Sequence, residues 1–339
     1  MMNRHQQKVT LGSSGLEATQ LGFGGGPLGN MFAPIAEDVA RQALDRAWGL
    51  GVRLYDTAPF YGFGTSERRV GAMLADKPRD EFVLTTKVGK LLRADASPKD
   101  EQFVDGEPFF RNVPDLNVEY DYSGDGARRS IEESLERLGL DRIDHVSVHD
   151  PDDYFEEAME GAIPALIELR SQGVIGSVGI GINQAELLER FVTGADLDLV
   201  LLAGRYSLLD QSALNTGLFE ATVRSNTAIM LGGVYNSGLL ARPEPGARFN
   251  YEAAPPELVE RARALAELCD CHGVPLMAAA IQFPLAHPAI TAVLTGVKSR
   301  EEIEENVRMI DMDIPGALWS DLRAEGLIPE GVPVPESDN

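Results

Sequence analysis

The strongest constraint on the fold is a regular alternation of short β-branched segments with longer segments of helical period. Strands that each lead into a helix are typical of a parallel sheet, because the crossover between two parallel strands has to pass over a face of the sheet. The expected strands are 19–23, 52–55, 82–86, 145–148, 174–180, 199–202, 228–231 and 292–295. The expected helices are 37–50, 65–75, 124–138, 156–172, 184–193, 210–224, 257–272 with 275–286, and 299–310.

Eight strand–helix units predict an α/β fold, a single (β/α)8 TIM barrel over residues 1–327. An open doubly wound sheet is the alternative, and it would carry a Gly-x-Gly-x-x-Gly turn between a strand and a helix. The nearest match, residues 22–26, is not followed by helical sequence, so we expect a loop there. Residues 328–339 are acidic and contain prolines, and they are expected to form a loosely ordered tail.

Two long segments interrupt the alternation. Residues 91–123 are rich in Asp, Pro, Phe and Tyr, and residues 235–256 contain four prolines. Both follow strands and therefore leave the C-terminal face of the barrel, where barrel enzymes hold their sites. We expect them to be long loops that act as lids.

Charge and hydropathy restrict the partners. A net charge of −23 disfavours nucleic acid, because the phosphates would be repelled. The chain has no stretch of 18 apolar residues, and residues 1–8 are polar, so we expect no membrane partner and a cytoplasmic location. Cys269 and Cys271 are two positions apart on an expected helix and point to different faces, which disfavours a disulfide or a metal pair. The remaining partner class is a small molecule, and the sequence specifies no oligomeric state.

Three expected strands end in a polar residue with chemical potential. Residues 52–55 lead into Asp56, residues 82–86 into Lys87, and residues 145–148 into His149. Side chains at the C-terminal ends of barrel strands project into the mouth of the barrel. Three such residues, with opposite charges among them, predict a catalytic site there.

Tyr61 supplies a fourth group, because the turn after Asp56 can return its hydroxyl over the mouth. A phenol has a pKa of about 10 and is a poor base at neutral pH. An ammonium about 4 Å away at an effective dielectric near 20 contributes roughly 4 kcal/mol, or about three pKa units. Lys87 is therefore expected to lower the pKa of Tyr61 towards 7, with Asp56 holding the lysine and His149 orienting the reacting oxygen. This chemistry is proton transfer at a carbonyl or alcohol oxygen.

Other chemistries find less support in the sequence. His145 and His149 are four apart on an expected strand, about 13 Å from each other, which is too far for a shared metal. The chain has neither a Gly-x-Ser-x-Gly elbow nor a Walker loop. Residues 150–153, Asp-Pro-Asp-Asp, are interpreted as a solvated turn.

With Asp56, Tyr61, Lys87 and His149 in register, the chain resembles the aldo-keto reductases from about residue 18 to 310. The segment 126–139, the helix before the histidine strand, matches as well. The resemblance implies a catalytic role for these four residues. It also implies a nicotinamide cofactor extended across the barrel mouth without a Rossmann fold.

Some positions depart from the common family pattern. Residues 203–209 replace a Gln-x-x-Tyr motif, residues 231–240 replace the segment of the nicotinamide-stacking tyrosine, and Gly181-Ile182 replaces a Ser-Asn pair. These variants, with residues 120–123, resemble the branch of D-threo-aldose 1-dehydrogenases, L-fucose dehydrogenases and pyridoxal 4-dehydrogenases. That branch oxidises cyclic hemiacetals to lactones.

The resemblance also implies binding residues. Those for the cofactor are Gly24, Asn183, Ser237, Gly238, Leu239, Gly296, Glu302, Glu305 and Asn306, and those for the substrate are Tyr120, Tyr122 and Tyr235. Glu302 stands where relatives place a basic residue for a 2′-phosphate, so NAD is expected, with NADP possible through Lys298 or Arg300. Glu302 can also be read simply as part of a helix capping box with Ser299.

These patterns predict an NAD-dependent dehydrogenase that oxidises an aldose or a similar cyclic hemiacetal. An NADPH-dependent aldehyde or ketone reductase on the same scaffold is the first alternative. A cofactor-sensing regulatory subunit with little turnover is the second.

Overall fold

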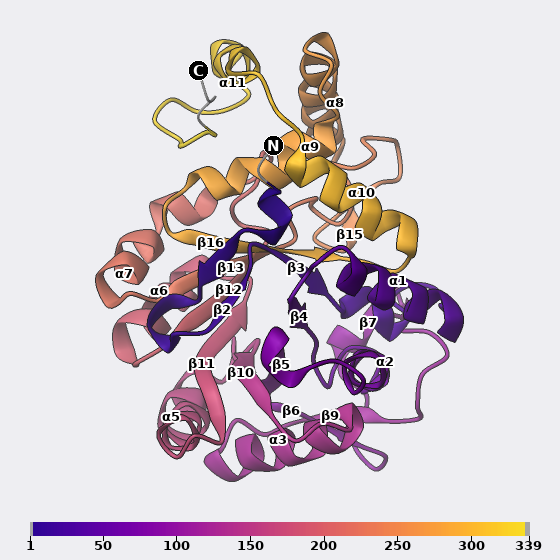
Figure 1. The fold of residues 1–339 in the computed structure, drawn as a ribbon, viewed down its shortest axis with the longest axis vertical. Helices are drawn as coiled ribbons and strands as arrows, with labels where there is room; N and C mark the ends of the chain where they lie inside the picture. Colours follow the sequence, from indigo (N-terminus) through magenta and orange to yellow (C-terminus); the bar gives the residue numbers. More distant parts are fainter. Residues whose placement is uncertain (1–2, 336–339) are drawn as a thin grey trace.

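The computed structural model describes residues 3–335, and its centre is a closed barrel of eight parallel strands (Figure 1). The strand order around the barrel is β10-β11-β12-β13-β16-β3-β4-β5. Their bounds are β3 Leu21–Gly24, β4 Leu54–Asp56, β5 Val83–Val88, β10 Ile143–His149, β11 Ile175–Ile182, β12 Leu199–Ala203, β13 Ala228–Gly232 and β16 Ile290–Gly296. Each corresponds to one expected strand, so the prediction of a single (β/α)8 barrel is confirmed.

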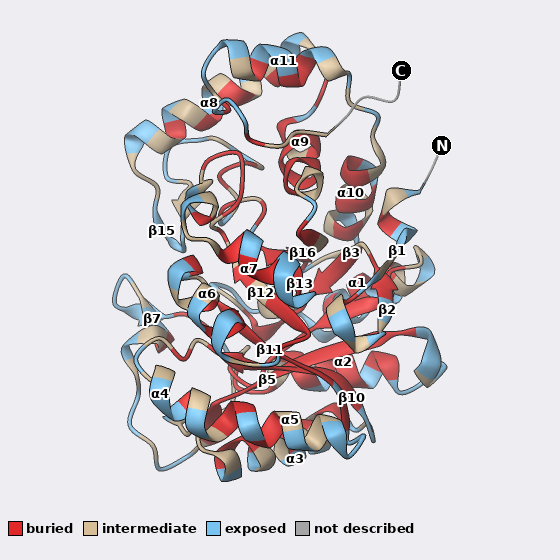
Figure 2. Ribbon diagram, turned by 90° about the vertical axis from the view of Figure 1, so that its left-hand side faces the viewer, coloured by how far each residue is buried: buried red, intermediate tan, exposed pale blue. Residues whose placement is uncertain are grey.

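Most helices surround this barrel and turn their apolar sides towards it, whereas Pro256–Cys271 and Gly316–Ala324 pack against each other at one end of the molecule. The helices are α1 Glu37–Gly49, α2 Thr65–Leu74, α3 Gly124–Leu138, α4 Phe155–Glu157, α5 Ile163–Ser171, α6 Ala185–Gly194, α7 Leu218–Ser225, α8 Pro256–Cys271, α9 Leu276–Gln282, α10 Arg300–Asp311 and α11 Gly316–Ala324. Figure 2 shows the strands as buried and the helices as striped, with buried residues inside and exposed residues outside. This pattern is what amphipathic helices on a buried parallel sheet require.

Two helices differ from the expectation for physical reasons. The expected helix 156–172 contains a π-helical turn, Ala158–Ala162, because the Ala162 amide donates to the Tyr122 carbonyl of a neighbouring segment. The expected helix 210–224 is divided into a 3-10 helix, Ser212–Asn215, and α7. Gly217 separates them with a φ of 78°, a value that glycine adopts without strain.

A hairpin closes the N-terminal end of the barrel. Strands β1 (Lys8–Thr10) and β2 (Glu17–Thr19) pair in antiparallel fashion, and Leu11 between them is fully buried against residues that include Leu54 and Leu294. Thr19, expected in the first barrel strand, therefore belongs to this hairpin instead. Because this end is filled, any small-molecule site lies at the opposite end, where the strands terminate.

The two long loops meet at that opposite end. The first contains the pairs β6 (Lys90–Arg93) with β9 (Asn117–Tyr120) and β7 (Phe103–Val104) with β8 (Glu107–Pro108); the second contains β14 (Arg248–Phe249) with β15 (Glu252–Ala253). The loops follow β5 and β13, which lie on opposite sides of the barrel order. Arg248 of the second loop lies 3.2 Å from Asp105 of the first, so the two loops join over the mouth.

The C-terminal part adds α11, which was not expected, and it lies with α8 at one end of the molecule (Figures 1 and 2). Ile328 and Val332 are buried, so a loosely ordered tail does not describe these two residues; residues 336–339 lie outside the described part. Cys269 is buried and Cys271 exposed, in agreement with their predicted divergence, and both are free.

Within residues 3–335 no single helix has the length and apolar composition of a membrane span. Pro256–Cys271 and Leu276–Ala286, bent by 103°, pass that test only as a joined pair.

Candidate active site

The register of three neighbouring strands aligns the predicted catalytic residues. Asp56 of β4 pairs with Thr85 of β5, and Lys87, two residues further on, pairs with Ser147 of β10. Residues two apart on a strand share a face, so Asp56, Lys87 and His149 all point to the same side of the sheet. That side is the barrel interior, at the end where the strands finish.

Lys87 and Asp56 form a buried ion pair. The Lys87 ammonium lies 3.0 and 2.8 Å from the two carboxylate oxygens of Asp56, and it donates to the Thr57 carbonyl at 3.0 Å. The exposed fractions of the two side chains are only 2% and 5%. Thr85 adds a hydroxyl donor to Asp56 at 2.6 Å. Asp56 therefore holds the lysine, as predicted, and compensates most of its charge.

Tyr61 returns to this pair through the expected turn. Its amide donates to the Ala58 carbonyl, and Gly62 next to it has a φ of 64° and packs so tightly on Gly29 that a Cβ would clash. The Lys87 nitrogen lies 4.6 Å from the centre of the Tyr61 ring, and the His149 ring centre lies 5.8 Å away, nearly perpendicular. The structure thus brings the four predicted residues together, and their catalytic roles remain predictions.

The predicted direction of the Tyr61 pKa is wrong for this structure. Its pKa is raised well above the ordinary value, first because burial disfavours the phenolate and second because the negative charge of Asp56 lies nearby. A lysine considered alone beside a phenol includes neither effect. Asp56 neutralises Lys87, so the pair offers a phenolate much less than a free ammonium would.

His149 is buried and uncharged at neutral pH. Burial lowers its pKa well below the ordinary value, although Asp150 opposes the shift. Its Nε2 atom lies 3.4 Å from an Asp150 oxygen, and its Nδ1 atom is buried without a hydrogen-bond partner among the described residues. A neutral imidazole in this position is suited to donate a hydrogen bond to a reacting oxygen.

A second buried lysine, which the sequence analysis missed, lies beside these residues. Lys90 has an exposed fraction of 1%, and its ammonium lies 2.5 Å from Glu101 and 2.9 Å from Asp150. Asp150 was expected in a solvated turn; the ion pair with Lys90 corrects that interpretation. The signals were present, since Lys90 is three residues after Lys87 and Asp150 directly follows His149.

Tyr122 does not line a substrate site, contrary to the prediction. Its side chain is fully buried, and its hydroxyl donates to the carbonyls of His149 at 2.8 Å and Asp150 at 2.9 Å. Its ring stacks on Tyr154 at 4.9 Å and lies 6.4 Å from Tyr120. Tyr122 therefore fixes the backbone of the histidine strand, and Tyr120 and Tyr154 are the half-buried members of this aromatic group.

Tyr235 is half-buried, and its predicted role as a substrate residue remains a prediction. Its hydroxyl donates to the Asn306 side chain of α10 at 3.0 Å, which places it with a residue predicted for the cofactor. Tyr251 of the same loop, which was not predicted, packs on Phe109 at 5.3 Å and joins the aromatic cover of the mouth. An aromatic residue in a long loop gives no sequence signal that separates these two placements.

The predicted cofactor residues gather at strand ends on the same face of the barrel. Gly24 pairs with Asp56 on one side and with Gly296 on the other, and Asn183 directly follows β11. The amides of Gly238 and Leu239 donate to carbonyls within their own turn, whereas the Ser237 hydroxyl accepts from the Tyr251 amide. The remaining predicted residues, Glu302, Glu305 and Asn306, belong to α10.

The residues present fit a dinucleotide in this region. Both amide atoms of Asn236 are buried without partners among the described residues. Buried polar groups normally find a partner, so this unsatisfied amide in the turn after β13 suits a bound ligand. Asn236 carried no sequence signal of its own.

Glu302 serves the helix as well as facing this region. Ser299 caps α10 by accepting from the Glu302 amide at 3.3 Å, and the Glu302 carboxylate accepts from the Lys298 amide at 2.9 Å. The Ser299 half of the expected capping box is thus present. The Glu302 carboxylate accepts from the amide of Lys298, and not from the amide of Ser299 as a capping box requires. The Lys298 ammonium, 3.6 Å from Glu302, offsets part of its charge.

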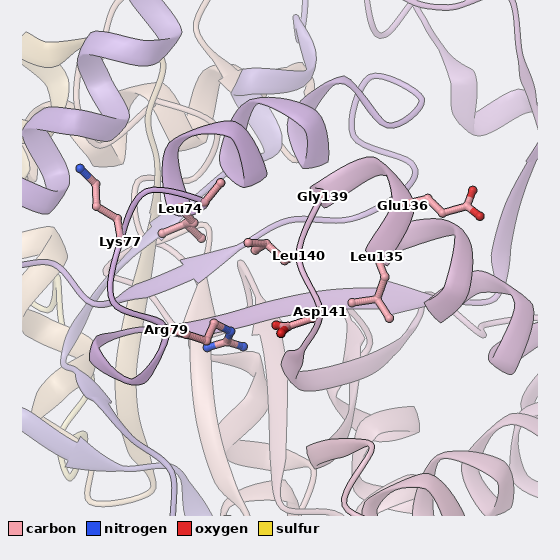
Figure 3. A pocket seen from close by; sticks show the side chains of 9 residues that line it. Leu74, Lys77, Arg79, Leu135, Glu136, Gly139, Leu140 and Asp141 are labelled. Carbon is pink, nitrogen blue, oxygen red and sulfur yellow. The ribbon is translucent and has the colours of Figure 1, made fainter.

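A separate surface hollow lies at the other end of the barrel. Figure 3 shows it between the ends of α2 and α3, lined by residues that include Leu74, Arg79 and Leu140. These helix ends lead into the starts of β5 and β10, so the hollow is on the N-terminal face, away from Tyr61. It has no part in the chemistry described above.

Comparisons with known proteins agree with this geometry. A family model described as the aldo/keto reductase family matches residues 20–324. The chain is 43% identical to a D-threo-aldose 1-dehydrogenase of a Pseudomonas species, covering 94% of this chain and 97% of that protein. It is 40% identical to a pyridoxal 4-dehydrogenase of Microbacterium luteolum, covering 95% and 98%. An aldo-keto reductase structure from Bacillus halodurans matches with a TM-score of 0.74 and 25% identity, covering 97% and 98%.

Proposed function

Because this chain belongs to the aldo/keto reductase family and is an oxidoreductase, we propose that it oxidises an aldose or similar cyclic hemiacetal to a lactone with NAD. The observation that carries the proposal is the buried Lys87–Asp56 pair beside the Tyr61 ring, with the His149 ring also next to that ring. The similarity to a D-threo-aldose 1-dehydrogenase and a pyridoxal 4-dehydrogenase over nearly the full length supports the choice of substrate class.

In this proposal the protein's own residues handle the proton. Tyr61, as the phenolate, accepts the proton of the substrate C1 hydroxyl as the hydride leaves C1, and neutral His149 donates a hydrogen bond that orients the same oxygen. The Lys87 ammonium, held by Asp56, stabilises the Tyr61 phenolate before it takes up the proton. The nicotinamide, when bound, accepts the hydride from C1.

The strand-end residues Asn183 and Gly296 and residues of α10 would hold the cofactor. Ser237, Gly238 and Leu239 contribute the turn after β13, and Glu302, Glu305 and Asn306 the helix. NAD is preferred because the Glu302 carboxylate would repel a 2′-phosphate. Binding of NAD and NADP, followed by protein fluorescence, tests this preference. Glu302→Arg is expected to improve NADP affinity, and an unchanged ratio of the two affinities would contradict the role of Glu302.

The activity itself is tested by NADH formation from a panel of L-fucose, D-arabinose, L-galactose and pyridoxal. Oxidation of at least one sugar hemiacetal supports the proposal. Absence of NADH with every compound, from protein that binds NAD, would remove the dehydrogenase assignment.

A carbonyl reductase is the second candidate, and the raised pKa of Tyr61 favours it. A protonated phenol at neutral pH is ready to donate a proton to a carbonyl oxygen, which is the step that reduction requires. Comparing NADPH-dependent reduction with NAD-dependent oxidation at the same pH separates the two. Tight cofactor binding without turnover in either direction would instead indicate a regulatory subunit.

A further inference from the structure

The backbone at Asp150 adopts a left-handed conformation that residues other than glycine rarely take. Asp150 has a φ of 41° at the end of β10, immediately after His149, and its amide donates to the Gly181 carbonyl at 2.9 Å. Residues in such conformations gather at functional sites, where the surrounding structure holds them against the strain. The effect here is to fix where the Asp150 side chain lies.

Lys90 holds the Asp150 side chain in place through an ion pair. Lys90 is almost fully buried, with its ammonium 4.8 Å from the centre of the Phe60 ring, and it contacts Asp150 and Glu101. Burying an ammonium requires close anionic partners, and both are supplied here. Burial raises the pKa of Asp150, but the positive charge of Lys90 outweighs this effect and lowers the pKa to about 2. Asp150 is therefore ionised.

One carboxylate oxygen of Asp150 remains available. Both contacts, with Lys90 at 2.9 Å and with His149 at 3.4 Å, are made by Oδ2. Oδ1 makes no hydrogen bond or ion pair within residues 3–335, and the side chain keeps an exposed fraction of 37%. Beside it, the buried Nδ1 of His149 and Oε1 of Glu101 are also without partners. A purely structural tether would leave fewer of these atoms unsatisfied.

The charge at this place selects among ligands. Asp56, Glu101 and Asp150 contribute three negative charges, against two positive charges from Lys87 and Lys90. The sum is negative, so phosphorylated or carboxylated substrates are disfavoured, whereas neutral hydroxyl groups can donate to the free carboxylate oxygen.

We propose that Asp150, fixed by Lys90, is a specificity residue that accepts a hydrogen bond from a ring hydroxyl of a neutral polyhydroxylated substrate next to the reacting carbon. This inference rests on the proposed function and names the feature that distinguishes a sugar from a plain hemiacetal. A site built to bind a hydroxyl discriminates strongly against analogues that lack it, because its polar group is then left unpaired.

The test uses two hemiacetals with the same six-membered ring. L-Fucose carries ring hydroxyls, and 2-hydroxytetrahydropyran carries none besides the reacting one. The kcat/KM of wild-type enzyme is expected to be about 100-fold or more higher for L-fucose than for 2-hydroxytetrahydropyran. This is roughly the factor that hydrogen bonds from the ring hydroxyls to a charged group and its neighbours contribute. Asp150→Asn is expected to lower kcat/KM for L-fucose by about 10- to 100-fold more than that for 2-hydroxytetrahydropyran, mainly through KM, because the effect of the lost charge on Tyr61 and His149 is common to both substrates.

Asp153→Asn is the matched control, because Asp153 is exposed and the substitution changes the same charge three residues away. Asp150→Gly is the second variant, since glycine accepts a φ of 41° and removes the carboxylate even if asparagine disturbs the loop. Thermal unfolding and NAD titration report on the fold of each variant.

The outcomes separate the two proposals. A loss that is about 10- to 100-fold larger for L-fucose than for 2-hydroxytetrahydropyran in both Asp150 variants, and absent in Asp153→Asn, supports the inference. Equal losses on both hemiacetals, no loss, or a wild-type enzyme without preference for L-fucose would overturn the inference and leave the dehydrogenase proposal intact. If the panel shows another of its sugars to be the better substrate, that sugar takes the place of L-fucose in this test, and if wild-type enzyme oxidises neither 2-hydroxytetrahydropyran nor any compound of the panel, the dehydrogenase proposal is the one that fails.

Discussion

Neutralising Asp56 and neutralising Lys87 are expected to move the pKa of Tyr61 in opposite directions. The Lys87 ammonium is 4.6 Å from the Tyr61 ring centre, where a unit charge at an effective dielectric near 20 interacts by about 3.6 kcal/mol, or about 2.6 pKa units. The Asp56 carboxylate is hydrogen-bonded to this ammonium and therefore lies within about 7 Å of the Tyr61 ring centre. At that distance its charge contributes about 2.4 kcal/mol, or about 1.7 pKa units, of opposite sign. The two effects partly cancel in the wild-type protein.

The assay is the pH dependence of kcat/KM for hemiacetal oxidation, which reports the pKa values of the free enzyme. Because oxidation needs Tyr61 to accept a proton, activity is expected to rise with pH, and the rising limb marks Tyr61. Asp56→Asn keeps an oxygen for Lys87 and should move this limb to lower pH by about one to two units. Lys87→Met should move it to higher pH by up to about 2.6 units. Shifts in the same direction, or no shift in either variant, would refute the electrostatic reasoning.

Three further predictions concern the support of the site. Lys90→Met leaves the carboxylates of Asp150 and Glu101 without their buried partner, so the free energy of unfolding should fall by about 3–5 kcal/mol in urea titration, and an unchanged midpoint would contradict the account. Tyr122→Phe removes the donor to two buried carbonyls, so the free energy of unfolding should fall by about 1–3 kcal/mol while the KM for substrate stays nearly unchanged. A large rise in KM would instead support the predicted role of Tyr122 in binding the substrate. His145 is buried between Ser147 and Ser177 and its pKa is lowered to about 3, so the unfolded chain binds a proton below about pH 6.5 that the native protein does not. Stability is therefore lost as pH falls from 6 to 4.5, and His145→Asn should make this loss shallower by about 1.4 kcal/mol per pH unit, whereas an unchanged slope would count against the lowered pKa.

The barrel and the meeting of four residues followed from local patterns. The strands that lead to Asp56, Lys87 and His149 can each be predicted from a few adjacent residues. Closure of the eight-stranded barrel then brings the ends of these three strands together. Tyr61 followed because the turn lies between Asp56 and the next helix. These parts of the site depend on short-range sequence and one global rule.

The remaining features depend on contacts between distant segments. Lys90 and Asp150 are 60 positions apart, and their pairing requires the register of the β6–β9 hairpin over the histidine strand. The same hairpin buries Tyr122, and the second loop turns Tyr235 to Asn306. The sign of the Tyr61 pKa shift needed the burial of the phenol and the compensation by Asp56, and neither is written in the spacing of residues.

The central claim is that the Tyr61 hydroxyl carries the proton of a nicotinamide-dependent oxidation. Single-turnover NADH formation from a sugar hemiacetal, compared between wild type and Tyr61→Phe, tests it most directly. The variant keeps the ring and its packing, so NAD affinity should remain within about threefold while the rate of NADH formation falls by about 100- to 10,000-fold. A variant that binds NAD and forms NADH at the wild-type rate would contradict the claim.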